Sequence, residues 1–431
     1  MINTSSSMPI ETGHPVDIAA TLDLLSARQA GEKLIAIPLR QRAAVFGYMS
    51  LHKQVALSRI LDRSDLAEIV TAMSADDRAD LFNYLPQGEQ EHLLRDLAQE
   101  EREDIRRLAA YADGTAGAMM TSDYATLPAN LTVSEAIELL RREAPDKETI
   151  YRAYILDDER KLIGSVPLKA LILAAEDTLI SDIMEKSPIR ARLEDKREKV
   201  AQKIARYDLL ALPVVDSERR LVGIVTHDDA ADAMQQENTQ DFHKIGTVGS
   251  LTQSVRDASI RVLFTKRIGW LALLIFGNLF SGAGIAAFED MILAYVALVF
   301  FLPLLIDSSG NAGSQSSTLM VRALATGDVE MKDWGKLIVR EVAVAILLGA
   351  AMALIVFPIG FARGGYEIAL TVGLTMIAVV FVGCLIGMSL PFILSRFNLD
   401  PATASAPLVT TISDAAGVIV YFSIATMVMG M

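Results

Sequence analysis

The sequence predicts a multidomain protein in which an α-helical soluble region, a repeated pair of α/β units and a helical membrane region follow one another. Three observations carry this prediction. Residues 17–112 show amphipathic helical periodicity without strand-like alternation, residues 119–234 contain an internal repeat, and five charge-free apolar runs follow residue 268. The chain of 431 residues is long enough for two to four domains.

The charge of the chain divides at the same boundary as its hydropathy. Residues 1–267 hold 43 acids and 34 bases, whereas residues 268–431 hold 10 acids and 6 bases, so the net charge of −13 divides into −9 and −4. An acidic soluble part argues against nucleic acid as a partner and is compatible with cation binding. The sequence therefore predicts a soluble acidic part attached to a lipid-embedded part.

Cysteine usage and the N-terminus indicate the compartment. Cys384 is the only cysteine of the sequence and lies in an apolar run, so we expect neither an intrachain disulfide nor a cysteine-based metal site. The polar N-terminus has no basic segment followed by an apolar one. We therefore expect no cleavable signal peptide and a cytoplasmic soluble part.

The first region contains short amphipathic helices, one of which begins in the segment SADDRADLFNYLP. Ser74 and Asp77 have the spacing of a capping box. Asp76 and Asp80 lie four residues apart, where like charges on one helical face cost about 0.2–0.5 kcal/mol. Two interpretations stay open: acids favoured at the start of a helix by its dipole, or ligands of a cation.

The internal repeat pairs AYILDDERKLIGSVPLKAL with LPVVDSERRLVGIVTHDDA. Asp157 and Gly164 each precede their counterparts, Asp216 and Gly223, by 59 residues. Each unit has the pattern helix, strand, acidic turn, strand, helix, which predicts two similar α/β units.

The segment THDDAADAMQQENTQD follows the second unit and gathers acids without any base. On a helix, Asp228 and Asp232 would share a face, as would Glu237 and Asp241, and each pair would repel. Such repulsion predicts a site where a bound cation relieves the repulsion between the acids.

Five apolar runs predict five membrane spans, because about 20 apolar residues cross a bilayer. The shorter two extend into polar but mostly uncharged sequence. Lys and Arg are concentrated before the first span and between the second and third, which predicts a cytoplasmic N-terminus and an outer C-terminus. The uncharged runs cover residues 269–288, 291–306, 342–362, 368–395 and 415–431.

Asp414 lies in the fifth span with no basic residue within a helical turn. A charge at the centre of a membrane helix costs about 2.5–3.5 kcal/mol, so such an acid faces water, a partner or a bound cation. The alternatives are a protonated or interface-bonded carboxyl and a cation site in a pore. Pro401, Pro407 and Gly417 predict a loosened helix around Asp414. Asp307 is a weaker candidate for such a cation site, because the alternative for its polar run is a re-entrant segment or a cytoplasmic turn.

The two repeated units resemble a pair of CBS domains. In many such domains an ending Gly-x-x-Thr/Ser-x-x-Asp holds the ribose and phosphate of an adenine nucleotide, and Gly223, Thr226 and Asp229 match it. The first unit reads GSVPLKA and lacks both polar residues. The resemblance implies at most one site for ATP or another adenine nucleotide. The alternative is that Thr226 and Asp229 form a capping box at the next helix.

The whole arrangement resembles the MgtE family of magnesium channels. The resemblance implies a superhelical all-α N domain, a CBS pair, a connecting (plug) helix and a five-helix transmembrane domain, assembled as a homodimer with its pore on the two-fold axis. The stretches that carry it are AGAMMTSDYATL, LPVVDSERRLVGIVTHDD, DFHKIG, GNAGSQSSTLMVRALATGD and LDPATASAPLVTTISDAAGVIVYF.

The resemblance also implies roles for single acids. Asp414 matches the pore aspartate of the family, and Asp228 is expected to be a solvated neighbour of the ligands. The sequence departs from the family at Gln240, where an acidic ligand is expected, at Ala406, and at Asp307, which adds a charge. The implied regulatory Mg²⁺ ligands are Asp76, Asp80, Asp208, Asp229, Asp232, Glu237 and Asp241.

We expect a domain division that follows this scheme. It comprises a disordered tail (1–15), an acidic helical N domain (16–115), the first CBS domain (116–178), the second CBS domain (179–243), the connecting helix (244–267) and the transmembrane domain (268–431).

The expected function is a Mg²⁺-selective channel that mediates Mg²⁺ uptake across the plasma (bacterial inner) membrane. Cytosolic Mg²⁺ bound between the N, CBS and plug elements would close it. The alternatives are an ion-coupled secondary transporter of Mg²⁺ or Co²⁺ and a nucleotide sensor anchored in the membrane. No HExxH, P-loop or GxSxG motif is present and the five histidines lack ligand spacing, so no enzyme is expected.

Overall fold

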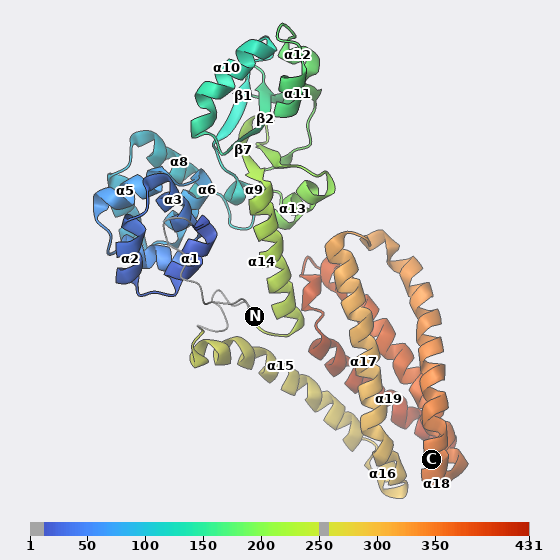
Figure 1. The fold of residues 1–431 in the computed structure, drawn as a ribbon. Coiled ribbons are helices and arrows are strands. Elements are labelled where there is room, and N and C mark those ends of the chain that lie inside the picture. The colour runs from blue at the N-terminus through green and yellow to red at the C-terminus, as the bar shows by residue number, and fades with distance from the viewer. Residues whose placement is uncertain (1–12, 250–257, 431) are drawn as a thin grey trace. The chain divides into compact units, whose positions relative to one another are not determined.

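A computed structural model describes residues 13–249 and 258–430 (Figure 1). The chain divides into two compact units, one ending at Gln235 and the other beginning at Gln236. Residues 1–12 of the predicted disordered tail (1–15) lie outside the described residues. The first helix begins at Pro15.

The first unit begins with eight short helices in its described part, as the periodicity predicts. Their apolar faces meet in one core that includes Leu22, Phe46, Ile69 and Leu94. Ser26 and Gln29 form a capping box at α2. The helices are α1 (Pro15–Asp23), α2 (Ala27–Ile35), α3 (Leu39–Tyr48), α4 (Leu51–Ser58), α5 (Arg63–Thr71), α6 (Ala75–Tyr84), α7 (Gln87–Arg95) and α8 (Gln99–Ala109).

The capping box predicted at α6 is wrong. Ser74 is the N-cap residue, but its side chain accepts no capping hydrogen bond from the helix. The first turn of α6 thus keeps Asp76 and Asp77 as acids near the positive end of the helix dipole.

Two small sheets follow α9 (Ala116–Met119) and repeat one pattern. In each, a strand pairs in parallel with the next, which pairs antiparallel with the one after it. Ile155 pairs with Gly164 in the first sheet, and Val214 with Gly223 in the second, so the predicted repeat is confirmed in register. The strands are β1 (Tyr124–Leu127), β2 (Thr149–Leu156), β3 (Leu162–Pro167), β4 (Glu185–Lys186), β5 (Ala191–Arg192), β6 (Ala211–Val215) and β7 (Leu221–Thr226).

Helices pack beside these strands and complete the two α/β units. Thr132 and Glu135 form a capping box at the first of them. The helices are α10 (Val133–Glu143), α11 (Leu168–Leu173), α12 (Ile180–Ile183) and α13 (Arg197–Arg206).

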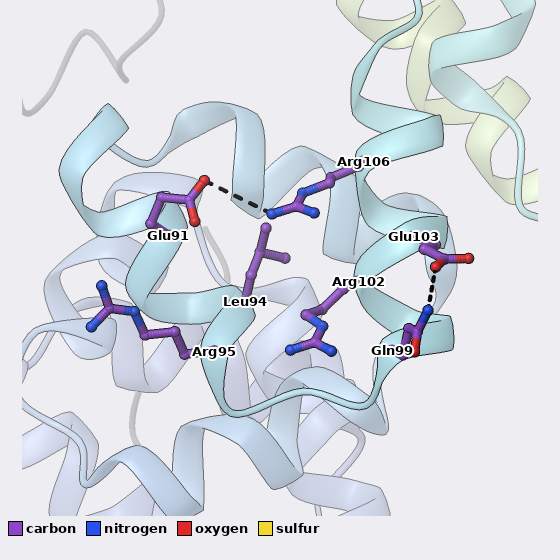
Figure 2. A pocket seen from close by; sticks show the side chains of 7 residues that line it. All are labelled: Glu91, Leu94, Arg95, Gln99, Arg102, Glu103 and Arg106. Carbon is purple, nitrogen blue, oxygen red and sulfur yellow. Dashed lines mark hydrogen bonds and ion pairs between the residues drawn. The ribbon is translucent and has the colours of Figure 1, made fainter.

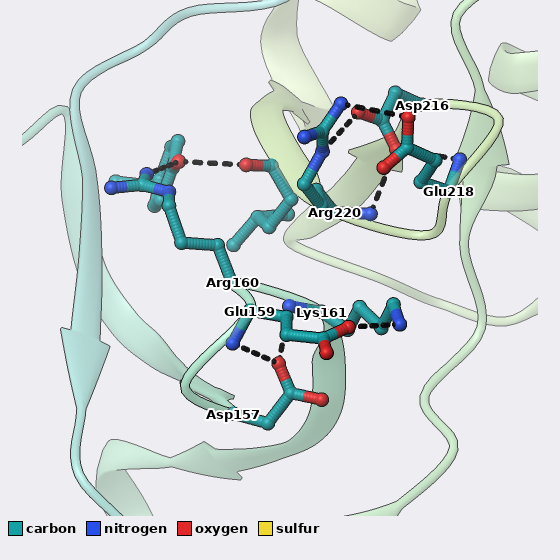
Figure 3. Close-up of polar contacts among 9 residues, drawn as sticks. Asp157, Glu159, Arg160, Lys161, Asp216, Glu218 and Arg220 are labelled. Atoms are coloured by element: carbon teal, nitrogen blue, oxygen red, sulfur yellow. Dashed lines mark hydrogen bonds and ion pairs between the residues drawn. The ribbon is translucent and has the colours of Figure 1, made fainter.

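The two acidic turns of the repeat are held by their aspartates (Figure 3). Asp157 Oδ1 accepts the backbone N–H groups of residues 159 and 161 at 3.0 and 2.8 Å, and Asp216 Oδ1 accepts those of residues 218 and 220 at 2.9 Å each. The turns also bond to each other, since Leu162 N–H donates to Arg219 O and Leu221 N–H donates to Arg160 O, both at 3.1 Å. These acids are therefore structural.

The helix α14 (His227–Ile245) follows β7 and carries the acidic segment. Of the connecting helix predicted over residues 244–267, the described parts are the end of α14, a turn at 246–249 and the start of the next helix. Residues 250–257 lie outside the described residues.

The second unit is helical throughout its described part after residue 258, apart from short connections. Three of its helical segments are long and apolar enough to cross a membrane: residues Ile260–Ala286, Met331–Arg396 and Ala406–Met429. The helices are α15 (Ile260–Ala286), α16 (Glu289–Ala294), α17 (Ala297–Thr326), α18 (Trp334–Arg396) and α19 (Ala406–Met429).

The 63-residue helix α18 is a hairpin of two segments. Gly364 and Gly365 leave the helical conformation, and Gly365 has a φ of 78°, which favours glycine. A Cβ added to Gly360 would lie 2.8 Å from Cα of Ala369, and one added to Gly349 would lie 2.8 Å from Cα of Ile377. These contacts on both sides of the bend show that the two segments run antiparallel.

Two expectations about the membrane region are corrected. The polar run after Asp307 is neither re-entrant nor a turn, because it lies inside the continuous helix α17. The helix around Asp414 is not loosened: α19 is continuous, and Pro407 occupies its first turn, where the missing N–H costs nothing.

Candidate functional site

The helix α6 packs on the second α/β unit through small apolar residues. Ala75 and Ala79 are buried in a core that also contains Ala230 of α14 and Val225 of β7. Because Ala75 and Ala79 lie next to Asp76 and Asp80 in sequence, this packing brings the acids of α6 close to the start of α14.

Seven carboxylates gather there, and their charges act on one another. They come from α6, from the segment before β2 and from the first turns of α14. We call this set the acidic patch; it consists of Asp76, Asp77, Asp80, Glu148, Asp228, Asp229 and Asp232.

The most enclosed carboxylates of the patch have raised pKa values. Burial and then the charges of Asp229 and Asp77 hold the pKa of Asp76 well above its usual range, and Oδ1 of Asp76 is buried without a hydrogen-bond partner. Burial raises the pKa of Asp229 to about 6, opposed by a hydrogen bond from Thr226 and assisted by the charge of Asp228. The fold thus holds these carboxyl groups where burial and neighbouring acids disfavour their ionised forms.

The outer members of the patch behave alike. Partial loss of hydration, then the charges of Asp229 and Asp228, raise the pKa of Glu148 to about 7. Partial loss of hydration, followed by the charges of Asp77 and Asp113, raises the pKa of Asp80 to about 6. Glu148 and Asp80 remain exposed, so a cation from solution can reach them. Such a cation would offset the repulsion between the carboxylates, which is one of the two causes of the raised pKa values.

The acidic patch has no ion-pair partner in the described part of the first unit. Within residues 13–249, none of its seven carboxylates forms an ion pair. The nearest base in sequence, Arg78, is buried and directs its guanidinium to Asp104 at 3.9 Å and Asp123 at 3.6 Å. The patch therefore attracts cations from solution.

The end of α3 borders the acidic patch. A Cβ added to Gly47 would lie 2.7 Å from Oδ2 of Asp77, so the carboxylate rests against the backbone of α3. Burial and the charges of Asp228 and Asp77 raise the pKa of Tyr48, the next residue. A larger residue at position 47 would displace Asp77.

The described residues contain no group of three or more His, Cys, Asp or Glu side chains arranged as a ready metal cage. Mg²⁺ dehydrates reluctantly and is often held through its waters by one or two carboxylates. A patch of carboxylates without a closed cage is compatible with such hydrated binding.

The remaining predicted regulatory residues are not among these seven carboxylates. Asp208 is exposed in the turn between α13 and β6, with a φ of 50°. Asp241 lies near Lys244, whose Nζ is 3.7 Å from Asp241 and 2.5 Å from Asp400. Burial raises the pKa of Asp241, Lys244 opposes that shift, and the charge of Asp400 adds to it. Glu237 lies two turns before the end of α14, and its charge also raises the pKa of Asp241.

The nucleotide motif has a local explanation. A Cβ added to Gly223 would lie 2.6 Å from Sδ of Met120 and 2.9 Å from the carbonyl oxygen of Thr121, so Gly223 permits close strand contact. The hydroxyl of Thr226 donates to the carboxylate of Asp229 at the start of α14. These contacts are those of a helix start, and nucleotide binding stays a prediction.

Asp414 lies on α19 where that helix meets α17. A Cβ added to Gly310 of α17 would lie 3.5 Å from Oδ1 of Asp414 and 2.7 Å from Cγ2 of Thr410. Further along, the hydroxyl of Tyr421 donates to the carbonyl oxygen of Leu298 at 2.9 Å. The two helices are therefore antiparallel neighbours over most of their length.

A surface hollow of about 260 Å³ lies between α7 and α8 (Figure 2). Arg106 approaches Glu91 to 3.9 Å, and Gln99 donates to Glu103 at 2.8 Å. The hollow contains none of the predicted site residues. Its lining is Glu91, Leu94, Arg95, Gln99, Arg102, Glu103 and Arg106.

Three members of the patch were not predicted as ligands. Asp77 and Asp228 stand in the segments SADDRADLFNYLP and THDDAADAMQQENTQD, whose high acid content is visible in the sequence. Glu148 lies between α10 and β2, and no local pattern in the sequence marks it. Its position next to α14 is a consequence of the parallel pairing of β1 and β2.

Comparisons with known proteins agree with this architecture. The family described as MgtE intracellular N domain matches residues 13–114, the CBS domain family matches 116–177 and 180–236, and the family described as MgtE, divalent cation transporter, matches 302–424. These segments follow one another as the helical region, the repeat pair and the membrane region.

The chain is 35% identical to a magnesium transporter MgtE of Thermus thermophilus over 97% of this chain and 94% of the relative. It is 31% identical to one of Bacillus subtilis over 97% of this chain and 92% of the relative. The crystal structure of the cytosolic domain of the Mg²⁺ channel MgtE in complex with ATP is 35% identical, with a TM-score of 0.50, over 52% of this chain and 91% of that one. Given this identity over nearly its whole length, the chain belongs to the MgtE family of divalent cation transporters, which are not enzymes.

Proposed function

We propose that this protein is a Mg²⁺ channel that admits Mg²⁺ into the cell and is closed when cytosolic Mg²⁺ binds its soluble part. Its relatives are named magnesium transporters over nearly the full length of this chain. The acidic patch, whose carboxylates form no ion pair within residues 13–249, is the observation that carries the regulatory half of the proposal.

The conducting part consists of five spans in this proposal. They are α15, α17, the two segments of α18 and α19. An odd number of spans puts the two ends of the chain on opposite sides, and the Lys and Arg before the first span favour the cytoplasm for the soluble part. The helix α17 is long enough to span, with 30 residues, although polar side chains lower its hydropathy. A helix of that length with a polar face is typical of a pore wall rather than of a lipid contact.

A homodimer with its pore on the two-fold axis would join two copies of Asp414. A divalent cation that keeps its waters needs only one or two carboxylates, so two aspartates related by symmetry suit Mg²⁺. The membrane potential would drive entry with about 2.3 kcal/mol per charge per 100 mV.

Closure would follow from the electrostatics of the soluble part. Without Mg²⁺, the like charges of the acidic patch favour separation of α6 from α14. With Mg²⁺, the cation offsets this repulsion and stabilises the compact arrangement, because a ligand shifts an equilibrium by its differential affinity for the two states. The ligands in this proposal are Asp76, Asp80, Asp208, Asp229, Asp232, Glu237 and Asp241, to which the geometry adds Glu148.

An adenine nucleotide could bind at the second CBS unit through Gly223, Thr226 and Asp229. The support is the solved relative, whose cytosolic domain binds ATP. Because Asp229 belongs to the acidic patch, its carboxylate would repel the phosphates of the nucleotide. Binding would therefore require either a Mg²⁺ ion between them or phosphates that lie away from Asp229.

Electrical recording on the reconstituted full-length protein tests the proposal. We expect currents carried by Mg²⁺ that rise with voltage and that fall when Mg²⁺ is raised on the side of the soluble part. Protease protection of that part should increase over the same Mg²⁺ range. Transport that requires a proton or sodium gradient, with no current, would instead support the coupled transporter.

A further inference from the structure

The helix α17 carries a polar stripe on an exposed face. Asp307, Asn311 and Gln315 are exposed and are spaced four residues apart, so they lie along one side of the helix. Between them, Ser309, Gly310, Ala312 and Gly313 are buried and Ser308 and Ser314 are half-buried. Ser316 and Ser317, which follow the stripe, are also buried.

Such a stripe does not suit contact with lipid. A charged side chain at membrane depth is costly and faces the interior of a bundle or a water-filled path. Among the described residues no Lys or Arg pairs with Asp307; instead the Nδ2 atom of Asn311 donates to its Oδ2 at 3.0 Å. The hydrogen bond orients the carboxylate and leaves Oδ1 free to act on a cation.

The register of α17 and α19 fixes the depth of Asp307. Gly310 contacts Thr410, with 2.7 Å from an added Cβ to Cγ2, and Gly313 contacts Val409, with 2.9 Å to Cγ1. Counting back along the antiparallel helices places Asp307 within about one turn, or 5 Å along the axis, of Asp414.

We infer that Asp307 is a second cation-selecting carboxylate of the pore, at the level of Asp414. This inference rests on the proposed channel function and on its dimer. Each subunit then offers two carboxylates from two different helices, and the dimer offers four around one hydrated cation.

The charge of such a ring selects by valence. The attraction of a carboxylate for Mg²⁺ is twice its attraction for a monovalent cation at the same distance. Asn311 and Gln315, on the same face, supply amide groups that hydrogen-bond with the waters of the cation. Asp307 therefore determines affinity and selectivity, while Asp414 remains the carboxylate of the pore that the family resemblance implies.

The test replaces the charge without changing the shape. Asp307→Asn keeps the size of the side chain and a group that Asn311 can bond. In recordings on the full-length protein, we expect the Mg²⁺ concentration for half-maximal current to rise about tenfold, and K⁺ current at low Mg²⁺ to increase. Asp307→Ser should match it, and Asp307→Glu should stay close to the unchanged protein.

The control is Glu367→Gln, which removes an exposed carboxylate of α18 beside the hairpin bend, away from the α17 stripe. It should leave half-saturation and selectivity unchanged. Size-exclusion chromatography identifies the variants that assemble.

Two outcomes separate the inference from the proposed function. If Asp414→Asn abolishes the current while an assembled neutral variant of Asp307 keeps normal half-saturation and selectivity, the inference is overturned and the channel stands. If Asp414→Asn also conducts normally, the pore assignment fails, and the inference fails with it.

Discussion

Two sets of aspartates in the soluble part have opposite electrostatic surroundings. Asp195 and Asp216 belong to the α/β repeat and are paired. Despite partial burial, hydrogen bonds from Lys199 and Lys203 lower the pKa of Asp195 to about 2. The pKa of Asp216 is likewise lowered, against desolvation, by hydrogen bonds from Arg220.

The acids of the patch differ from these two in their neighbours and in the direction of their pKa shifts. Asp76 and Asp229 have raised pKa values and are surrounded by other acids. The difference teaches that acid content alone does not mark a cation site in this protein. What marks it is the absence of a base within reach of acids that the fold holds together.

Asp414 belongs to the unpaired class, and its loss should give the largest effect. We expect Asp414→Asn to reduce Mg²⁺ flux at least about 100-fold, because the variant loses a carboxylate that attracts the hydrated divalent cation at that depth of the membrane. Flux into vesicles loaded with a Mg²⁺ indicator measures it. Normal membrane insertion is the required control, and normal flux would contradict the pore assignment.

Changing the patch should alter regulation and not conduction. The double variant Asp229→Ala with Asp232→Ala should need about tenfold more Mg²⁺ for half-maximal protease protection of the soluble part. The matched control is Asp182→Ala, an exposed acid at α12 outside the patch. An unchanged midpoint in the double variant would show that the patch does not bind the regulatory cation.

The raised pKa values predict a proton release on Mg²⁺ binding. Asp80 and Asp229 have pKa values of about 6 and Glu148 of about 7, above those of free carboxyls, so protons and Mg²⁺ compete for the patch. Mg²⁺ affinity should fall as the pH falls from about 8 to about 6, with most protons released near pH 6–7.

Calorimetric titration of the full-length protein in buffers of different ionisation enthalpy measures this release. It should vanish near pH 8.5, where the carboxyls are already ionised. The variant Asp229→Ala with Asp232→Ala should release fewer protons at pH 6.5. Equal release at both pH values would contradict the assigned shifts.

Changing a paired aspartate should give the smallest effect, and that effect should be on stability and not on the response to Mg²⁺. Asp216→Ala removes the acceptor of two backbone N–H groups and of Arg220, so we expect a loss of about 1–3 kcal/mol in stability of the soluble part. Pulse proteolysis in urea measures the shift. The loss should be the same with and without Mg²⁺; a loss that Mg²⁺ restores would place Asp216 among the ligands.

Much of the fold could be predicted from the sequence because it repeats or alternates. The 59-residue spacing between Gly164 and Gly223 reappears in the strand register, and the apolar runs became the long helices. The acidic segment after Thr226 was identified as a candidate site by its missing bases alone.

Other features depend on tertiary packing and were out of reach. Glu148 joins the patch only because β2 lies beside β1 and Asp123. Hydropathy does not distinguish a polar-faced helix from a turn, so the sequence alone does not determine the structure of the polar run after Asp307. The loosened helix expected at Asp414 was wrong because Pro407 falls in the first turn of α19, where proline is tolerated.

The glycines between α17 and α18 have a consequence for motion. A Cβ on Gly387 would lie 1.9 Å from the carbonyl oxygen of Gly313, and one on Gly383 would lie 2.3 Å from that of Ser309. The two helices therefore touch backbone to backbone over about one turn, with no side chains between them that could allow one helix to slide along the other. They move as one rigid wall, so any change in the width of the passage has to come from a tilt of the whole wall or from its neighbours.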